Sequence, residues 1–244
     1  MIDIIAELGS NPVDYEWNTE RFCKFVAQAG ATHIKIQVYK SEHFPAPYQD
    51  EKRRLEFPRH RIREFADNAH RFGLKAGASV FDEEAVEICA AEMDFLKLAA
   101  REQDNWKLAG MVADTGKSYF RSISNLSLFR SVLFIDREGY WQGEKNVSNR
   151  KTLYAIQKYP APMTLSVFHL LRYRKFISNK HGVGDKWGWS SHTTGALDCI
   201  LAARLGASAI EKHLALSRSD VEAGHSLNPV KFLKMASKIR MVEK

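Results

Sequence analysis

The chain has 244 residues, of which 45% are hydrophobic and 27% charged, which is ordinary for a soluble globular protein. Its 36 Lys and Arg against 29 Asp and Glu give a net charge of +7, which favours anionic partners without identifying them. The basic residues are scattered and no nucleic-acid-binding motif accompanies them. We therefore expect no nucleic-acid partner.

No apolar run approaches the roughly 20 residues of a membrane span, so we expect no membrane association. Residues 1–5 are too few and too acidic for a signal peptide. The three cysteines, Cys23, Cys89 and Cys199, lie in predicted helices among apolar neighbours, without a Cys-x-x-Cys pair. These features predict buried, reduced thiols and a cytoplasmic protein.

Short β-rich runs alternate with amphipathic helical stretches along the chain. Strands are expected at residues 2–8, 33–39, 75–81, 95–100, 119–124, 152–157, 187–191 and 209–214. Helices are expected at residues 19–29, 61–72, 83–91, 106–114, 165–177 and 196–205, with a last one after Asn228 and Pro229. This alternation predicts a single (β/α)8 TIM barrel over residues 1–244, close to the roughly 250 residues typical of that fold.

The regular alternation is interrupted after the fifth predicted strand. Residues 131–145 resemble two short strands around a turn at residues 136–139, so we expect a β-hairpin insertion that replaces or crowds the fifth helix.

A doubly wound open sheet is the alternative fold. Such sheets usually carry a glycine-rich phosphate loop after the first strand, whereas residues 7–11 (ELGSN) contain one glycine.

Active sites of such barrels lie at the carboxyl ends of the strands, where this chain has many polar residues. Lys35 and Gln37 are two apart and share one strand face with His33, which we expect to point into the barrel. Buried lysines and hydroxyls could form a cage for a phosphate or carboxylate, and the candidates are Lys35, Lys97, Ser79, Ser122 and Ser190. The alternative is that these lysines face outward or pair with Glu7 and Glu102.

Two histidines, His192 and His213, end the seventh and eighth predicted strands. Two neutral imidazoles there suit Mn²⁺, Mg²⁺, Zn²⁺ or Fe²⁺, although a histidine pair can also be structural. Water and substrate oxygens would complete the coordination, with Glu7 nearby as a supporting carboxylate. His225, in a loop after Gly224, is a weaker candidate.

Two segments are the most specific motifs of the chain. They are residues 188–195 (GWSSHTTG), similar to GYSDHTxG, and residues 205–213 (LGASAIEKH), similar to LGAxxIEKHF. Less specific motifs are residues 5–11 (IAELGSN), 34–37 (IKIQ), 95–99 (FLKLA) and 226–229 (SLNP). With these motifs the sequence resembles the N-acetylneuraminate (sialic acid) synthase family and its pseudaminic and legionaminic acid relatives.

The resemblance implies an enzyme that joins phosphoenolpyruvate to an amino-sugar aldehyde such as N-acetylmannosamine, releasing phosphate. It implies that Lys35, Lys97, Ser79, Ser122 and Ser190 hold phosphoenolpyruvate. It implies that His192 and His213 hold a divalent metal, Mn²⁺ or Mg²⁺, and that Glu7 lies by the metal-bound water or the reacting carbons. The residues that it implies face the sugar are Gln37, Glu102, Gln157, Tyr159 and Glu222. Members of the family are dimeric, so a homodimer is expected.

Several positions depart from the family pattern. Ala100 and Arg101 stand where the family has Ser and Gly, Ser191 replaces an aspartate, and Gln157 replaces a sugar-contacting asparagine. The sequence ends at Lys244, so we expect no antifreeze-like domain after the barrel. Two other functions therefore stay open: a Schiff-base aldolase that uses Lys97 or Lys212, and a barrel that binds ligand without catalysis.

Overall fold

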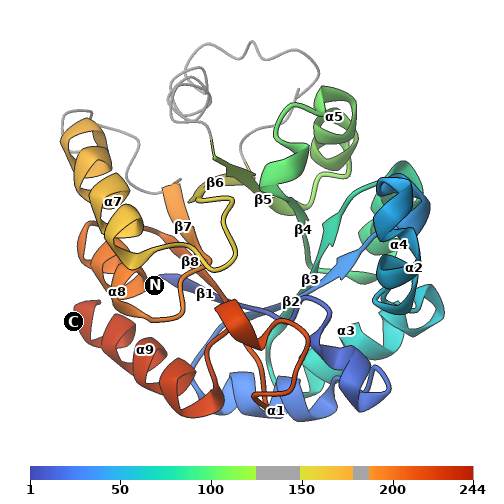
Figure 1. Cartoon of the computed structure of the whole chain (residues 1–244), viewed down its shortest axis with the longest axis horizontal. Helices are drawn as coiled ribbons and strands as arrows, with labels where there is room; N and C mark the ends of the chain where they lie inside the picture. Colours follow the sequence, from blue (N-terminus) through green and yellow to red (C-terminus); the bar gives the residue numbers. More distant parts are fainter. Residues whose placement is uncertain (125–148, 178–186, 244) are drawn as a thin grey trace.

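A computed structural model describes residues 1–124, 149–177 and 187–243 (Figure 1). Eight parallel strands form a closed barrel in the order β1 to β8, with helices around its outside. The strands are β1 (Asp3–Glu7), β2 (His33–Val38), β3 (Lys75–Val80), β4 (Phe95–Leu98), β5 (Ser118–Ile123), β6 (Arg150–Ala155), β7 (Trp187–Ser191) and β8 (Ala209–His213). The (β/α)8 prediction is confirmed, and the open-sheet alternative is wrong because β1 pairs with both β2 and β8.

The described α-helices cover the outer face of the strands. They are α1 (Glu20–Gln28), α2 (Ala46–Arg54), α3 (Ile62–Arg71), α4 (Glu83–Glu92), α5 (Trp106–Asp114), α7 (Met163–Ile177), α8 (Leu197–Arg204) and α9 (Pro229–Val242). Short 3-10 helices add η1 (Asn11–Tyr15), η2 (Ser41–His43), η3 (Arg59–Arg61), η4 (Ala100–Glu102) and η5 (Ala223–His225). Helix α2 was not predicted from the sequence, because none of its residues is buried and it therefore has no apolar stripe. The hairpin predicted at residues 131–145 lies outside the described residues.

The space between strands and helices holds the main hydrophobic core. Ile34, Ile36 and Val38 of β2 are fully buried in it, as the alternation of that strand predicts. Each cysteine is free and buried within its helix, as expected. In the part of the chain that is described, no helix is both long and apolar enough to cross a membrane.

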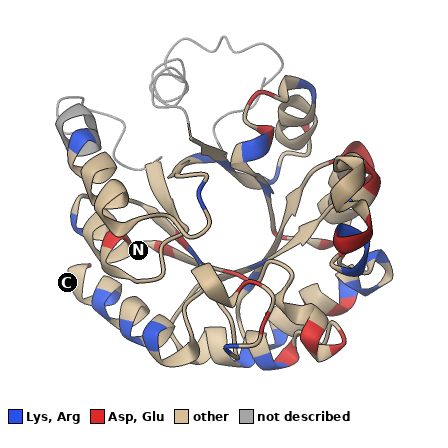
Figure 2. Ribbon diagram, viewed as in Figure 1, with Lys and Arg blue, Asp and Glu red and all other residues tan. Residues whose placement is uncertain are grey.

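Charged residues occur on the outer helices and also on the barrel strands (Figure 2). Basic residues gather on α9, where Lys231, Lys234 and Lys238 are exposed. The charges inside the barrel lie deep in the structure, where ionised groups need partners. These buried charges therefore mark the barrel interior as the candidate functional region.

The barrel interior has an apolar floor below these charges. It is built by one buried side chain each from five strands, namely Ile5, Phe95, Phe120, Leu153 and Ala209. His33 also points inward, with its ring centroid 5.1 Å from that of Phe95 and 5.9 Å from that of Phe120. The floor closes one end of the barrel and leaves the carboxyl ends of the strands to form a site.

We predict a pH dependence of stability from His33. Burial lowers the pKa of His33 from 6.5 to about 4, so the unfolded chain binds a proton more readily between these two values. Stability should therefore fall as the pH is lowered from about 6.5 to about 4, by about 3 kcal/mol from this residue. Urea unfolding across this range, compared between the native chain and His33→Gln, measures the effect. Equal pH slopes in the two proteins would contradict it.

Candidate active site

A cavity of about 500 Å³ opens at the carboxyl ends of the barrel strands. Most of the site residues predicted from the sequence line it, and these are Glu7, Gln37, Ser79, Lys97, Ser122, Gln157, Tyr159, Ser190, His192, His213 and Glu222. Two predicted residues do not line the cavity. Lys35 is fully buried behind Ser79, to whose Oγ its Nζ donates at 2.7 Å.

Glu102 lies outside the cavity, in contrast to the prediction that it faces a sugar. Its carboxylate accepts hydrogen bonds from Arg101 Nε at 3.1 Å and from Asn105 Nδ2 at 3.0 Å. Arg101 lines the cavity instead, with its guanidinium carbon 4.3 Å from the ring centroid of Phe44 and 4.9 Å from that of Phe81. The cavity rim thus presents a cation where a carboxylate was expected.

A layer of four buried charges lies between the apolar floor and the cavity. Glu211 forms an ion pair with Lys97, and its Oε1 also accepts from Ser190 Oγ at 2.8 Å. Its Oε2 lies 3.8 Å from Lys35 Nζ, while Lys35 forms a further ion pair with Glu7. Both lysines therefore point inward and are also paired with carboxylates. The Lys35–Glu7 pair was among the alternatives considered from the sequence, whereas the Lys97–Glu211 pair was not.

The electrostatics of Glu211 follow from this packing. Burial by itself would raise the pKa of the Glu211 carboxyl, but Lys97 and Lys35 outweigh burial and hold that pKa below its usual range. Burial lowers the pKa of Lys35, and Glu211 opposes that shift. The layer therefore consists of opposite charges that stabilise one another.

The inward direction of Glu211 was not predicted, although its position in the sequence indicates it. Glu211 lies two residues before His213 on β8, so both side chains point to the same side of the strand. Because His213 was expected to face the site, the strand alternation also predicts that Glu211 points into the barrel.

Two buried atoms in this layer have no hydrogen-bond partner among the described residues. They are Ser122 Oγ, which lines the cavity, and Glu211 Oε2. A buried hydroxyl without a partner is unfavourable, and a ligand oxygen in the cavity could accept its hydrogen bond. Together with Lys97 and Ser190, Ser122 forms a surface suited to an anionic ligand.

The cavity also holds the predicted histidine pair, at the carboxyl ends of β7 and β8. The ring centroids of His192 and His213 are 5.5 Å apart. His192 Nδ1 donates to the carbonyl oxygen of Ile156 at 2.7 Å, which leaves its Nε2 as the free lone pair. Burial lowers the pKa of His192 to about 3 and that of His213 to about 4, so both rings are neutral near pH 7, the form that binds metals.

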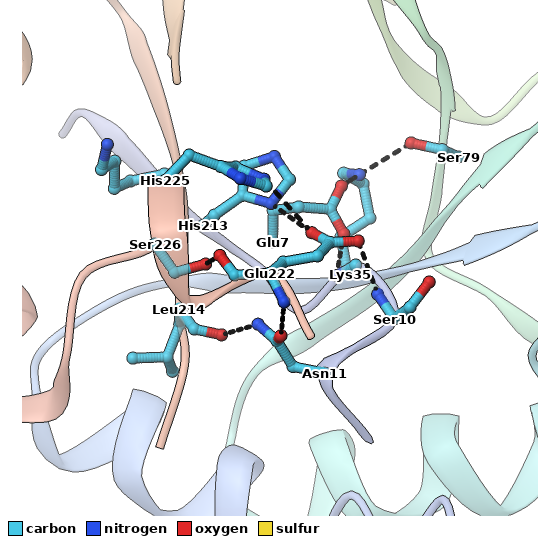
Figure 3. A network of polar contacts seen from close by, with 12 residues as sticks. Glu7, Ser10, Asn11, Lys35, Ser79, His213, Leu214, Glu222, His225 and Ser226 are labelled. Carbon is cyan, nitrogen blue, oxygen red and sulfur yellow. Dashed lines mark hydrogen bonds and ion pairs between the residues drawn. The ribbon is translucent and has the colours of Figure 1, made fainter. Parts of the chain in front are cut away.

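A third imidazole and a carboxylate adjoin His213 (Figure 3). His213 Nδ1 and Glu222 Oε2 are 2.8 Å apart, and His225 Nε2 lies 3.5 Å from the same oxygen. The ligand atoms of His213, Glu222 and His225 all lie within 4.8 Å of one another, so this group could hold a metal ion. Burial would raise the pKa of Glu222, but its bonds to the two histidines outweigh it and hold that pKa below its usual range.

The turn after β1 packs against Glu222. Ser10 N donates to Glu222 Oε1 at 2.9 Å, and Gly9 has a φ of +55°. A Cβ on Gly9 would lie 2.0 Å from Glu222 Oε2, so only glycine fits at this position. This packing holds the Glu222 carboxylate against His213 at the cavity wall.

Other cavity residues were not identified from the sequence. Tyr39, Phe44 and Lys52 line the cavity from the segment after β2 that includes η2 and α2, and Ser10 lines it from the turn after β1. Because α2 has no apolar stripe, no periodicity pointed to this segment.

The closed barrel, with its charged layer and histidine cluster, makes the chain a (β/α)8 protein with a polar cavity at the carboxyl ends of its strands. A model of the NeuB family matches residues 22–244, and the chain belongs to that family.

Individual relatives agree with this assignment. An uncharacterized protein of Methanocaldococcus jannaschii is 27% identical, with 99% of this chain and 71% of that protein covered. N-acetylneuraminate-9-phosphate synthase of Homo sapiens is 25% identical, with 99% and 70% covered. The crystal structure of N-acetylneuraminic acid (sialic acid) synthetase from Leptospira borgpetersenii, in complex with citrate, is similar with a TM-score of 0.85 at 22% identity, over 99% of this chain and 83% of that one. At this identity the structural likeness shows a shared fold.

We predict that Glu211→Gln destabilises the fold by about 3–5 kcal/mol, because it leaves Lys97 and Lys35 with less compensating charge in a buried layer. Inorganic phosphate should restore part of the loss, so the rise of Tm with phosphate should be larger in the variant than in the native chain. Thermal unfolding with and without phosphate measures both effects.

Glu83→Gln is the matched control, because Glu83 forms an exposed ion pair with Lys107. Such pairs contribute little to stability, so this variant should behave like the native chain. If Glu211→Gln were as stable as this control, the charged layer would not contribute as described.

Proposed function

We propose that the chain is a sugar-acid synthase that condenses phosphoenolpyruvate with an amino-sugar aldehyde resembling N-acetylmannosamine, giving a nonulosonic acid and phosphate. Membership of the NeuB family and the named relatives support a synthase in the broad sense. The observation that carries the finer proposal is one cavity lined both by Lys97 with serine hydroxyls and by neutral histidines. The proposal includes a cytoplasmic location and a homodimer.

Phosphoenolpyruvate would bind on the side of the charged layer. Lys97 lines the cavity and can contact a phosphate or carboxylate directly, with hydroxyls from Ser122 and Ser190 beside it. Lys35 lies behind Ser79 and would act through that hydroxyl and through its charge. Binding of an anion would compete with Glu211 for Lys97, which makes the ion pair adjustable rather than purely structural.

A divalent metal, Mn²⁺ or Mg²⁺, would be held by His192 and His213. The residues fit such a group, because both imidazoles are neutral and the hydrogen bond from His192 Nδ1 to Ile156 leaves His192 Nε2 free for an ion. When bound, the metal supplies Lewis acidity that polarises the aldehyde oxygen. Gln37, Gln157 and Tyr159 line the cavity and would contact the sugar, with Tyr159 packed on His192 at a centroid distance of 4.2 Å.

Glu7 would take part in the water step. Carbon 3 of phosphoenolpyruvate attacks the aldehyde carbon, and a cationic centre forms at carbon 2. The aldehyde oxygen takes up a proton and becomes a hydroxyl. Water adds at carbon 2 and loses a proton. The new carbon 2 hydroxyl then loses its proton as the carbonyl forms, and phosphate leaves with the electrons of its carbon–oxygen bond and takes up a proton. Glu7 is buried, accepts from Gly9 N at 2.7 Å and is paired with Lys35, so it is held as a carboxylate that can stabilise the cation or accept the proton.

The aldolase alternative finds less support in the geometry. A Schiff base requires a neutral amine next to the substrate. Lys97 is paired with Glu211, while Lys212 does not line the cavity and donates to Ser191 Oγ at 3.2 Å.

The direct test is release of inorganic phosphate from phosphoenolpyruvate with Mn²⁺ across acetamido sugars, their phosphates, and arabinose and erythrose phosphates. We expect release that requires one aldehyde and the metal, with His192→Ala reducing it by at least about 100-fold. Phosphoenolpyruvate binding without release for any aldehyde would instead indicate a binding protein. A borohydride-trapped mass increase would indicate the aldolase.

For Glu7→Gln we expect turnover to fall by about 100-fold or more while phosphoenolpyruvate binding is kept, because the change removes a charge near the reacting carbons and not the lysine and hydroxyl contacts. Single-turnover phosphate release and calorimetric binding separate the two quantities. Loss of binding together with a lower Tm would give Glu7 a structural role.

A further inference from the structure

We propose that His225 binds the same divalent ion as His213, and that Glu222 provides the carboxylate of this centre. The sequence identified His192 and His213 as the metal ligands and His225 as a weaker candidate. Any role of the ion in a reaction rests on the proposed function. The binding of the ion rests only on the geometry of the three residues.

The three side chains already converge. Glu222 Oε2 lies 2.8 Å from His213 Nδ1 and 3.5 Å from His225 Nε2, and the two rings have centroids 4.6 Å apart. All three side chains are largely buried at the cavity wall, with exposed fractions of 5% for His213, 16% for Glu222 and 14% for His225. Two imidazoles and one carboxylate at such spacing are a donor set that fits a first-row divalent ion.

The local structure explains why Glu222 and His225 meet. Glu222 precedes the 3-10 helix η5, which ends at His225. In a 3-10 helix the side chains three residues apart lie on the same side, so this single turn brings both ligands toward His213. Tyr159 packs against His225 with a ring centroid distance of 5.1 Å and restricts that imidazole further.

Hydrogen bonds hold this turn in place before any ion binds (Figure 3). Glu222 N donates to Asn11 Oδ1 at 2.8 Å, and Asn11 Nδ2 donates to the carbonyl oxygen of Leu214 at 2.8 Å. Ser226 Oγ donates to the carbonyl oxygen of Glu222 at 2.7 Å. A site whose ligands are fixed by such support binds metal more tightly than one whose loop must first be ordered.

The donor set determines which ions bind well. With imidazoles from His213 and His225, and a further imidazole from His192 beside them, the centre favours Mn²⁺, Fe²⁺, Co²⁺ or Zn²⁺ over Mg²⁺, which prefers oxygen ligands. Of the two ions named for the reaction, the proposal therefore selects Mn²⁺. Excess Mg²⁺ should displace neither Mn²⁺ nor Co²⁺ from the protein.

The test replaces His225 by cysteine and adds Co²⁺. A thiolate at position 225 that binds the ion directly produces an intense thiolate-to-cobalt charge-transfer absorption in the near ultraviolet, which a nearby but unbound cysteine does not. The native cysteines should be silent, because they are buried and burial raises the pKa of Cys23 and Cys89 to about 12. His60→Cys, at an exposed histidine on η3, is the matched control and should give no band.

The second measurement does not depend on how cysteine is tolerated. His225→Gln should weaken Co²⁺ and Mn²⁺ binding by at least about 10–100-fold, the loss typical even of residues that only support metal ligands. Pulsed electron paramagnetic resonance of Mn²⁺ should show coupled imidazole nitrogens in the native chain and fewer in His225→Gln. No charge-transfer band in a folded His225→Cys protein, or unchanged nitrogen couplings in His225→Gln, would overturn the proposal.

The two proposals fail separately. A charge-transfer band without phosphate release from any aldehyde would leave the metal site standing and remove the synthase. If the native chain released phosphate but the His225 variants bound metal normally, the synthase would stand and the proposed role of His225 would be wrong.

Discussion

The site depends on the carboxylate of Glu211 held between two buried lysines. Ionised groups at the centre of a barrel are unfavourable by several kcal/mol each unless they are paired and hydrogen-bonded. Glu211 meets this requirement for Lys97 through an ion pair and contributes to it for Lys35, whose other partner is Glu7. An aliphatic layer of similar volume would satisfy the fold equally well, so the charges are better explained by what they present to the cavity.

The alternation of the strands sets the height of each residue in the barrel. On β2, His33 belongs to the floor, Lys35 to the charged layer and Gln37 to the cavity wall. Ala209, Glu211 and His213 repeat this order on β8. On these two strands, a two-residue step therefore moves from apolar packing to charge compensation to the cavity wall.

The same alternation explains what the sequence could predict. The strands carry long, regular patterns, and the residues at their carboxyl ends were identified because a barrel brings those ends together. Partners were harder to predict. Lys97 pairs with Glu211 from the far side of the barrel, and Glu102 turns to Arg101 and Asn105, because these contacts are decided by side-chain packing that periodicity does not encode. Helix α2 was not predicted because none of its residues is buried, although its Lys52 lines the cavity.

The turn after β1 joins the two sides of the site. At one end Glu7 pairs with Lys35 of the charged layer, and at the other Ser10 N binds Glu222, the carboxylate that contacts His213. Gly9 lies between them in a backbone conformation that other residues rarely adopt, with no room for a side chain beside Glu222. The charged layer and the histidine cluster therefore share one short backbone segment, from Glu7 to Ser10, whose conformation both sets of contacts require.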